Sequence, residues 1–187
     1  MKKLRVAIIG TGGIANSHAK AYLKMEDVEL VAGADIVEGK ARDFLDKLEL
    51  HNAKAFNSAK EMLASVKPDA VSVCTYNTTH AICAIEALNA GCHVLLEKPM
   101  TVTLDDAKEI VKAEKANGKI LTIGFQPRYD SRMKRIREII QEGLLGKIYY
   151  IQTGGGRRRG IPSKTFIEKK YAGVGALADI EIGRAHV

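Results

Sequence analysis

Glu97, Lys98 and Pro99 follow a short apolar run in the stretch HVLLEKPM (93–100), and two of them carry side chains able to do chemistry. An apolar strand that ends on adjacent opposite charges has three readings: a solvated strand end, an internal salt bridge, or a lysine held for chemistry. Pro99 disfavours the helical region for Lys98 and so restricts its backbone. A lysine held in a cleft can hydrogen-bond a substrate hydroxyl and help its proton leave. Glu97 then reads as an orienting partner and not as a base.

A second candidate site is GTGGIA (10–15), which matches the pattern G-x-G-x-x-A. The match follows a predicted strand and opens a predicted helix, which is the context that a dinucleotide-binding fingerprint requires. In that fingerprint the first glycine permits a tight turn, the second lets the backbone approach a pyrophosphate, and the alanine keeps helix and sheet close. A glycine turn without a ligand is the alternative. The candidate cofactor-binding residues here are Gly10, Gly12, Gly13, Ile14 and Ala15.

Asp35 ends the second predicted strand, 20 residues beyond Ala15. An acidic side chain at that position takes the ribose hydroxyls of NAD and repels the 2′-phosphate of NADP. The neighbouring Ile36 and Val37 offer no cation that would hold such a phosphate. The pattern therefore favours NAD as the cofactor, with NADP less favoured.

Apolar runs and helical segments alternate along the first two thirds of the chain. Strands are predicted at 4–10, 28–35, 53–56, 68–75, 92–97 and 119–125, and helices at 13–25, 38–50, 58–66, 79–91 and 103–118. Apolar strands separated by helices predict an α/β fold, a Rossmann-type doubly wound parallel sheet. In such a sheet the ligand crevice lies outside the carboxyl ends of the strands, so Lys98 and the residues from Thr75 to Asn77 are expected to face one crevice.

The regular alternation of strands and helices ends after the sixth predicted strand. A basic helix is predicted at 130–143, a strand at 146–156 and the start of a helix at 173–180. We therefore expect residues 1–123 to form a dinucleotide-binding domain and residues 124–180 to begin a second, α+β domain that is truncated.

Composition excludes several classes of protein. With 187 residues, of which 46% are hydrophobic, the chain can bury a core, and no apolar run approaches the roughly 20 residues of a membrane span. Three cysteines without a C-x-x-C pair predict free thiols and a cytoplasmic protein. The net charge of +7 lies entirely in residues 128–187, with 13 basic against 6 acidic residues. A solvated loop is favoured over a nucleic-acid tail, because no aromatic residues are interleaved with the arginines of GRRRG (156–160).

Several segments together resemble the glucose–fructose oxidoreductase / inositol dehydrogenase / rhizopine-catabolism (Gfo/Idh/MocA) family. They are GTGGIA, the stretch 74–100, GFQPRYD (124–130) and GKIYYI (146–151). The resemblance implies an N-terminal Rossmann domain, a C-terminal domain with an open sheet, and oxidation or reduction of sugars and polyols with NAD or NADP. It also implies cofactor-side positions, which are Thr75, Asn77, His80, Glu97 and Lys98.

Two positions differ from the family pattern. Tyr76 stands where a proline is usual, and the second catalytic element, resembling G-G-x-L-x-D-x-G-x-H, is incomplete. GVGALADI (173–180) supplies Asp179 at the aspartate position, but Gly183 occupies the histidine position and His186 is out of register. The resemblance thus implies Lys98 and Asp179 as catalytic residues and no metal.

The last seven residues, EIGRAHV (181–187), correspond to a translation of a common short-read sequencing adapter. We therefore expect a non-native tail on a truncated gene fragment, which takes no part in the fold.

The sequence as a whole predicts the N-terminal half of an NAD-dependent oxidoreductase. The full-length parent would transfer hydride between nicotinamide and a sugar or polyol, without nucleic acid or membrane partners, as a homo-oligomeric dimer or tetramer. This half would bind cofactor but lack complete catalytic machinery. The alternatives are an NAD-dependent glycosidase of the same family and a non-catalytic NAD-binding regulator.

Overall fold

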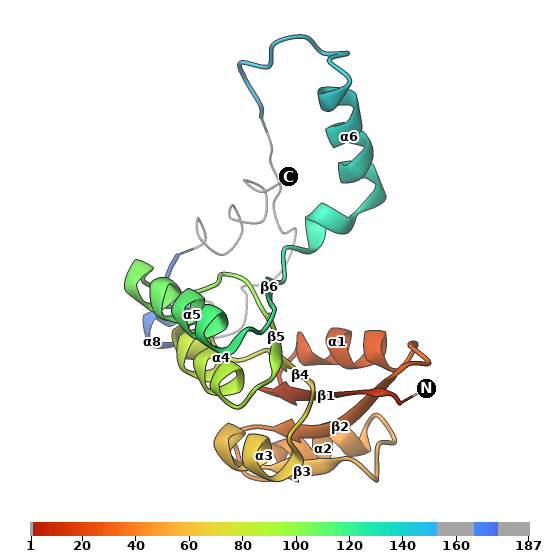
Figure 1. Ribbon diagram of the computed structural model, residues 1–187, viewed down its shortest axis with the longest axis vertical. Coiled ribbons are helices and arrows are strands. Elements are labelled where there is room, and N and C mark those ends of the chain that lie inside the picture. Colours follow the sequence, from red (N-terminus) through yellow and green to blue (C-terminus); the bar gives the residue numbers. More distant parts are fainter. Residues whose placement is uncertain (1, 153–166, 176–187) are drawn as a thin grey trace.

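A six-stranded parallel sheet with helices on both faces forms most of the computed structural model, which describes residues 2–152 and 167–175 (Figure 1). The strand order is β3-β2-β1-β4-β5-β6. The strands are β1 (Leu4–Ile9), β2 (Val28–Ala34), β3 (Lys54–Phe56), β4 (Ala70–Val73), β5 (His93–Leu96) and β6 (Leu121–Ile123). The reversal of order between β1 and β4 is that of a doubly wound Rossmann sheet, as the alternation of elements predicts.

Helices connect every pair of consecutive strands, and each lies within a helix predicted from the sequence. They are α1 (Ala15–Tyr22), α2 (Lys40–Asp46), α3 (Ala59–Val66), α4 (His80–Asn89, after the 3₁₀ turn η1, Asn77–Thr79) and α5 (Leu104–Asn117). Side chains cap two of these helices. Ser58 accepts a hydrogen bond from the Glu61 amide at the start of α3, and Thr103 accepts one from the Asp106 amide at the start of α5.

The sheet is buried on both faces because its central strands are mostly apolar. In β1, Val6 and Ile8 point to one face, where they pack with residues of α1 and α2. Ala7 and Ile9 point to the other face and belong to the cluster formed with α3, α4 and α5. All four side chains are at most 3% exposed. This two-sided burial is what selects a parallel sheet covered by helices.

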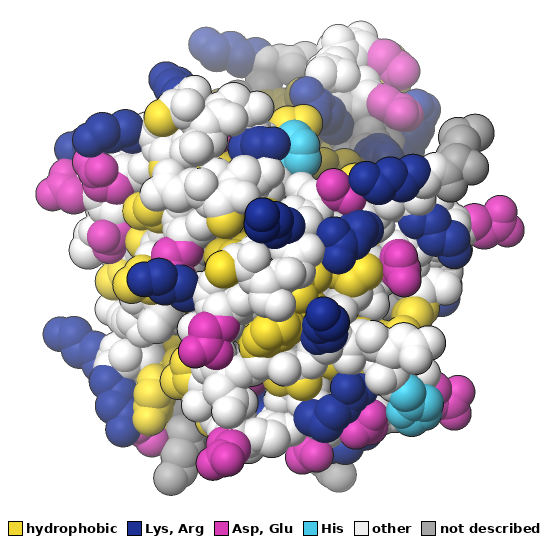
Figure 2. Space-filling view, turned by 60° about the horizontal axis from the view of Figure 1, so that its bottom comes forward, with side chains coloured by type: hydrophobic (Ala, Val, Ile, Leu, Met, Phe, Trp, Pro, Cys, Tyr) yellow, Lys and Arg dark blue, Asp and Glu magenta, His cyan; other side chains and the backbone are white. Residues whose placement is uncertain are grey.

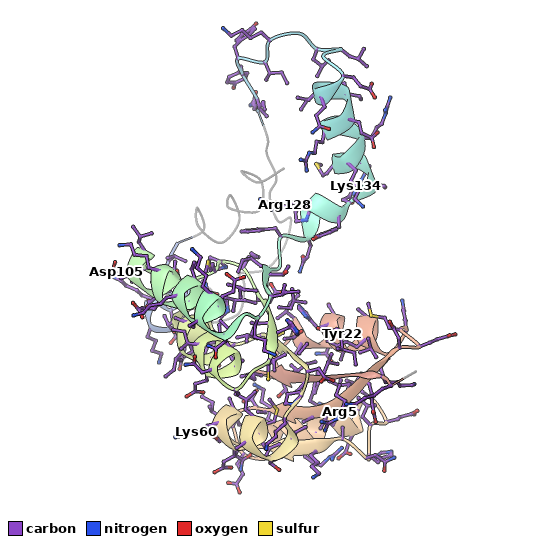
Figure 3. All side chains as sticks on the ribbon, in the orientation of Figure 1. Arg5, Tyr22, Lys60, Asp105, Arg128 and Lys134 are labelled. Atoms are coloured by element: carbon purple, nitrogen blue, oxygen red, sulfur yellow. The ribbon has the colours of Figure 1, made fainter. Side chains whose placement is uncertain are left out.

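The chain after β6 is organised differently. A 3₁₀ turn, η2 (Gln126–Tyr129), leads into α6 (Ser131–Gln141), which projects away from the sheet (Figure 1). Figure 3 marks this transition with Arg128 on η2 and Lys134 on α6. A short helix, α8 (Lys169–Ala172), returns to the Rossmann domain.

The strand predicted at 146–156 is wrong over its described part, because residues 146–152 form no strand. An apolar segment becomes a strand only where a neighbour satisfies its backbone edge, and the described residues supply none there. The segments 153–166 and 176–187, with GRRRG, Asp179 and the tail, lie outside the described residues. Within the described ranges, no helix is long and apolar enough to cross a bilayer.

Gly10 brings the ends of three strands together. Its amide donates to the Ala34 carbonyl at the end of β2 (2.8 Å), while the Cys74 amide donates to Ile9 (2.7 Å). The φ angle of Gly10 is +86°, and a Cβ added there would lie 2.8 Å from the Cys74 carbonyl carbon and oxygen. Only glycine satisfies both the backbone angle and the contact.

Replacing Gly10 with alanine is expected to destabilise the domain more than the same change at Gly39. Gly39 has a φ of +76°, but its added Cβ would meet nothing within 4 Å. Gly39→Ala should therefore cost only the backbone penalty of about 1–2 kcal/mol. Gly10→Ala should cost about 1–3 kcal/mol more, because backbone must move. Urea unfolding of both variants measures the difference, and equal losses would contradict the contact.

Leu88→Ala and Ile82→Ala compare the two faces of α4. Leu88 is fully buried in the cluster with β4 and β5, whereas Ile82 is 60% exposed. Truncating the buried side chain leaves a cavity, so Leu88→Ala is expected to lower the free energy of unfolding by about 2–5 kcal/mol. Ile82→Ala should change it by about 0.5 kcal/mol or less. Similar losses for the two variants would place α4 in a different orientation.

Candidate functional site

The candidate site lies at the carboxyl edge of the sheet, where β1, β2, β4 and β5 end side by side. The first glycine loop leaves β1, and Asp35 follows β2. The segment from Cys74 to Thr79 follows β4, and Glu97 follows β5. Parallel strands place all these segments at one edge, so the residues predicted from separate motifs come together there.

The glycine loop is open on the side away from the sheet. A Cβ added to Gly12 or Gly13 would meet nothing within 4 Å, in contrast to the tight contact at Gly10. Ala15, the first residue of α1, is fully buried against the sheet, and Ile14 precedes it. A helix N-terminus preceded by an open glycine loop is the arrangement that receives a pyrophosphate. The described residues therefore fit the dinucleotide that the fingerprint implies.

Asp35 is 8% exposed, and four donors of the protein surround its carboxylate. Oδ2 accepts hydrogen bonds from the Thr11 amide and hydroxyl (both 2.9 Å) and from Lys40 Nζ (2.7 Å), and Oδ1 accepts one from the Val37 amide (3.0 Å). Burial is the largest single influence on Asp35 and raises its pKa. The hydrogen bonds from Lys40, Val37 and Thr11 together lower the pKa by more, so its net shift is downward. Asp35 therefore carries a negative charge that fixes the glycine loop through Thr11.

Glu97 is buried at the end of β5, so the apolar strand does not end in solvent. Its side chain is 7% exposed, and Oε1 lies 2.7 Å from Nε2 of His18 on α1. Oε1 also accepts a hydrogen bond from the side-chain amide of Gln126 (3.4 Å), and Oε2 accepts one from the backbone N–H of Lys98 (3.3 Å). Glu97 thus connects α1, β5 and the turn after β6 directly beneath Lys98.

His18 continues this network to β4. Its Nδ1 lies 3.0 Å from Ser72 Oγ, and the Ser72 hydroxyl also bonds the hydroxyl of Tyr22. Burial is the largest influence on Tyr22 and raises the pKa of its hydroxyl. His18, Ser72 and Tyr22 were not predicted as site residues from the sequence. The signal available was the i, i+4 spacing of His18 and Tyr22, which places both on one face of a helix.

His80 joins the ends of β4 and β5. Its ring is 1% exposed, with Nδ1 2.7 Å from the Pro99 carbonyl and Nε2 3.3 Å from the Thr75 carbonyl. Burial lowers the pKa of His80 more than these two carbonyls raise it. A neutral ring has a single N–H, and the shorter contact is the one to Pro99. His80 therefore holds the peptide on the carboxyl side of Lys98 in place.

Residues 76–78 contact the returning helix α8. The side-chain amide of Asn77 donates to the Ala172 carbonyl (2.9 Å), and the Thr78 hydroxyl donates to the Lys170 carbonyl (3.2 Å). The rings of Tyr76 and Tyr171 lie 4.8 Å apart between centroids. A proline in place of Tyr76 would supply no aromatic ring for Tyr171 to pack against. This departure from the family pattern therefore has a structural consequence.

The structure thus brings together every predicted site residue except Asp179, which lies outside the described residues. The three cysteines do not add a nucleophile to the site. Burial raises the pKa of Cys74 far above its usual value, and it raises the pKa values of Cys83 and Cys92 to about 11. Among the described residues, no three His, Cys, Asp or Glu side chains converge as a metal site.

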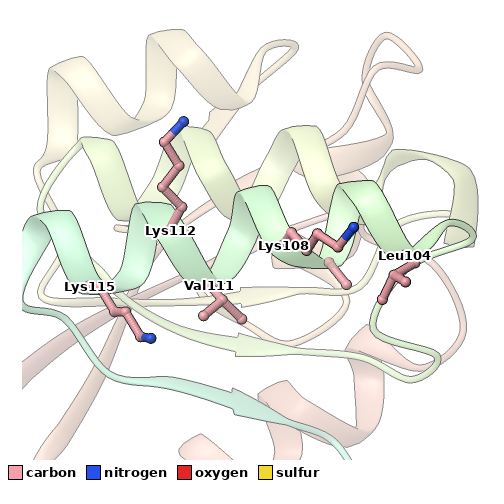
Figure 4. Close-up of a pocket in the computed structure, with 6 residues that line it drawn as sticks. Leu104, Lys108, Val111, Lys112 and Lys115 are labelled. Atoms are coloured by element: carbon pink, nitrogen blue, oxygen red, sulfur yellow. The ribbon is translucent and has the colours of Figure 1, made fainter.

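Two other surface features are less suited to a ligand. A groove on the outer face of α5 is lined by Leu104, Val111 and the stems of lysines, and one helix alone forms it (Figure 4). A single helix cannot enclose a small molecule. Figure 2 shows basic and acidic side chains interspersed on one face of the molecule, an arrangement unlike the basic stripe of a nucleic-acid binder.

Comparison with known proteins gives consistent results. Residues 4–125 match the family described as an oxidoreductase family with an NAD-binding Rossmann fold. The chain is 39% identical over 181 residues to D-glucoside 3-dehydrogenase of Escherichia coli K12. This alignment covers 96% of this chain and 51% of the relative. It is 36% identical over 146 residues to inositol 2-dehydrogenase of Salmonella typhimurium LT2, covering 77% of this chain and 43% of the relative.

Solved structures agree with this assignment. Myo-inositol 2-dehydrogenase from Lactobacillus plantarum has a TM-score of 0.72 and 31% identity, covering 79% of this chain and 43% of the other. The WlbA dehydrogenase from Bordetella pertussis, in complex with NADH and UDP-GlcNAcA, has a TM-score of 0.71 and 32% identity, covering 79% and 45%. This chain spans about half the length of the curated relatives it matches. With its Rossmann sheet, its glycine loop and the E-K-P turn at one edge, the chain belongs to the Gfo/Idh/MocA oxidoreductase family.

Proposed function

We propose that the crevice at the carboxyl edge of the sheet binds NAD, and that the full-length protein is a dehydrogenase of a sugar or polyol hydroxyl. The observation that carries this proposal is that the glycine loop after β1 and the E-K-P turn after β5 both contact the segment that follows β4. Gly10 packs against Cys74 and Thr75, and the buried His80 ring lies between the Thr75 carbonyl and the Pro99 carbonyl. The open glycine loop and Lys98 therefore belong to one crevice.

Each end of the cofactor has candidate partners in this crevice. The loop formed by Gly12, Gly13 and Ile14 would receive the pyrophosphate, and Asp35 with its neighbours would contact the adenosine ribose. Thr75, Asn77, Glu97 and Lys98 follow β4 and β5 and would line the nicotinamide end. Asn77 also holds α8, so its contribution includes placing that helix at the crevice.

Bound NAD supplies the hydride acceptor for the carbon that carries the substrate hydroxyl. The protein's part is to hold that hydroxyl and to direct its proton. Lys98 lies on a turn fixed on both sides, by Glu97 at its amide and by His80 at the Pro99 carbonyl. A fixed lysine would hydrogen-bond the hydroxyl oxygen and lower the barrier to loss of its proton. Relatives named as D-glucoside and inositol dehydrogenases support a sugar or polyol as the substrate.

The rest of the machinery belongs to the second domain, which we propose begins at about residue 124. Exposed apolar side chains after α6 support further partners for this region in the full-length protein; they are Leu144, Leu145, Tyr149, Tyr150 and Ile151. Asp179 would join Lys98 at the substrate, and the histidine of the family pattern would come from natural sequence beyond residue 180. We also propose that the full-length protein forms a homo-oligomer.

Gly12→Val tests the cofactor site without disturbing the fold. The space beside Gly12 is open, so the variant should keep its melting temperature within about 2 °C of the parent chain. The added side chain would occupy the approach of the pyrophosphate, and NADH affinity should fall by about tenfold or more. Fluorescence titration with NADH and thermal unfolding measure the two effects. Unchanged NADH affinity, or no NADH binding by the parent chain, would contradict the proposed crevice.

Lys98→Met in the full-length protein tests the chemical role. Removing the ammonium should lower kcat for polyol oxidation by about 10²–10⁴-fold while NADH affinity changes little. Lys112→Met on the outer face of α5 is the matched control and should retain normal kcat. Initial rates of NADH formation provide the measurement. Normal turnover by the Lys98→Met enzyme would remove Lys98 from the reaction.

A further inference from the structure

Lys40 lies at the position where the two dinucleotide cofactors differ. Its Nζ is 2.7 Å from Oδ2 of Asp35, the carboxylate that ends β2 and faces the adenosine ribose in this fold. Gly39, with its φ of +76°, turns the chain so that the first residue of α2 reaches back to the strand end. The residues that follow Asp35 directly, Ile36 and Val37, carry no charge.

Oδ2 of Asp35 has little capacity left for a ribose hydroxyl. A carboxylate offers about four lone-pair positions. Thr11 supplies two donors to Oδ2, Lys40 a third, and the Val37 amide occupies Oδ1. A ribose hydroxyl approaching Oδ2 must therefore displace Lys40 or bind to it.

Of the Lys40–Asp35 pair, Lys40 is the exposed member and the one accessible to a ligand. Its side chain is 39% exposed, whereas that of Asp35 is 6% exposed. An ammonium has three donors, so Lys40 can keep its bond to Asp35 and still offer donors to an incoming oxygen. The hydrogen bond from Lys40 also lowers the pKa of Asp35, against the opposing effect of burial. The two side chains form a pair without net charge.

The stability of α2 does not explain why a lysine occupies position 40. A cation in the first turn of a helix is unfavourable with respect to the helix dipole. The ion pair with Asp35 compensates for that position, but it remains only partly buried and so contributes modestly to stability. Its effect is larger on a ligand that carries a charge at this point.

We propose that Lys40 is a specificity-determining residue that lets this site accept the 2′-phosphate of NADP(H) as well as the ribose of NAD(H). This inference rests on the proposed cofactor site. Ile36 and Val37 offer no cation, as expected from the sequence, but the structure brings Lys40 to this position. Asp35 alone would repel a 2′-phosphate, but Lys40 offsets that charge and provides donors for the phosphate oxygens.

The test compares NADH and NADPH affinities of this chain with those of Lys40→Met, Lys40→Arg and Lys47→Met. Lys47 is an exposed residue at the other end of α2, so Lys47→Met makes the same change in net charge away from the crevice. The parent chain should bind NADPH within about tenfold of NADH. Lys40→Met should weaken NADPH binding by about tenfold or more, and NADH binding by no more than about threefold. Lys40→Arg should retain NADPH binding, and Lys47→Met should match the parent chain.

The possible results separate this inference from the cofactor site itself. If the parent chain binds NADH but binds NADPH more than about a hundredfold less tightly, Lys40 does not accommodate the phosphate. The same conclusion follows if Lys40→Met leaves NADPH binding unchanged or weakens both cofactors equally. In those cases the NAD site stands and only the inference is overturned. If neither nucleotide binds, both are overturned. Melting temperatures of the free variants show whether any loss comes from unfolding.

Discussion

A buried carboxyl group determines the architecture of this site. Glu97 sits at the end of β5 with almost no solvent contact, and a polar group in such a place is tolerated only when partners surround it. Those partners come from three parts of the chain: His18 on α1, the backbone of Lys98, and Gln126 after β6. Apolar packing drives these elements together, but packing is non-directional. The demand for partners at Glu97 fixes which residues meet and so fixes the turn that carries Lys98.

The same logic applies at the adenosine end of the crevice. Asp35 is nearly buried, and its bonds to the Thr11 amide and hydroxyl tie the glycine loop to the end of β2. Gly10 allows this loop to lie against β4 because it has no Cβ. Two acidic residues, one after β2 and the other after β5, thus organise two ends of the sheet's carboxyl edge. One is enclosed by a helix and a turn, and the other is paired with a partly exposed lysine that a ligand can reach.

The chain after β6 makes specific contacts with the turn that follows β4. Asn77 and Thr78 donate to carbonyl groups of α8, and Tyr76 contacts Tyr171. A segment about 95 positions further along the sequence is therefore bound beside the turn that follows β4. This arrangement joins residues that would bind cofactor to the part of the chain that would carry substrate-binding residues.

The sequence by itself determined the sheet and its ligand-binding edge. Continuous apolar runs such as 6–9 and 94–96 predict strands that are buried on both faces, and the glycine fingerprint predicts the loop after the first strand, since both signals are local. Tertiary structure decided which side chains surround each motif. His18, Ser72 and Lys40 were not found from sequence because their roles depend on contacts with Glu97 and Asp35 that no local pattern encodes. The strand expected at 146–156 failed over residues 146–152 for the same physical reason, since a strand exists only where a neighbour pairs with it.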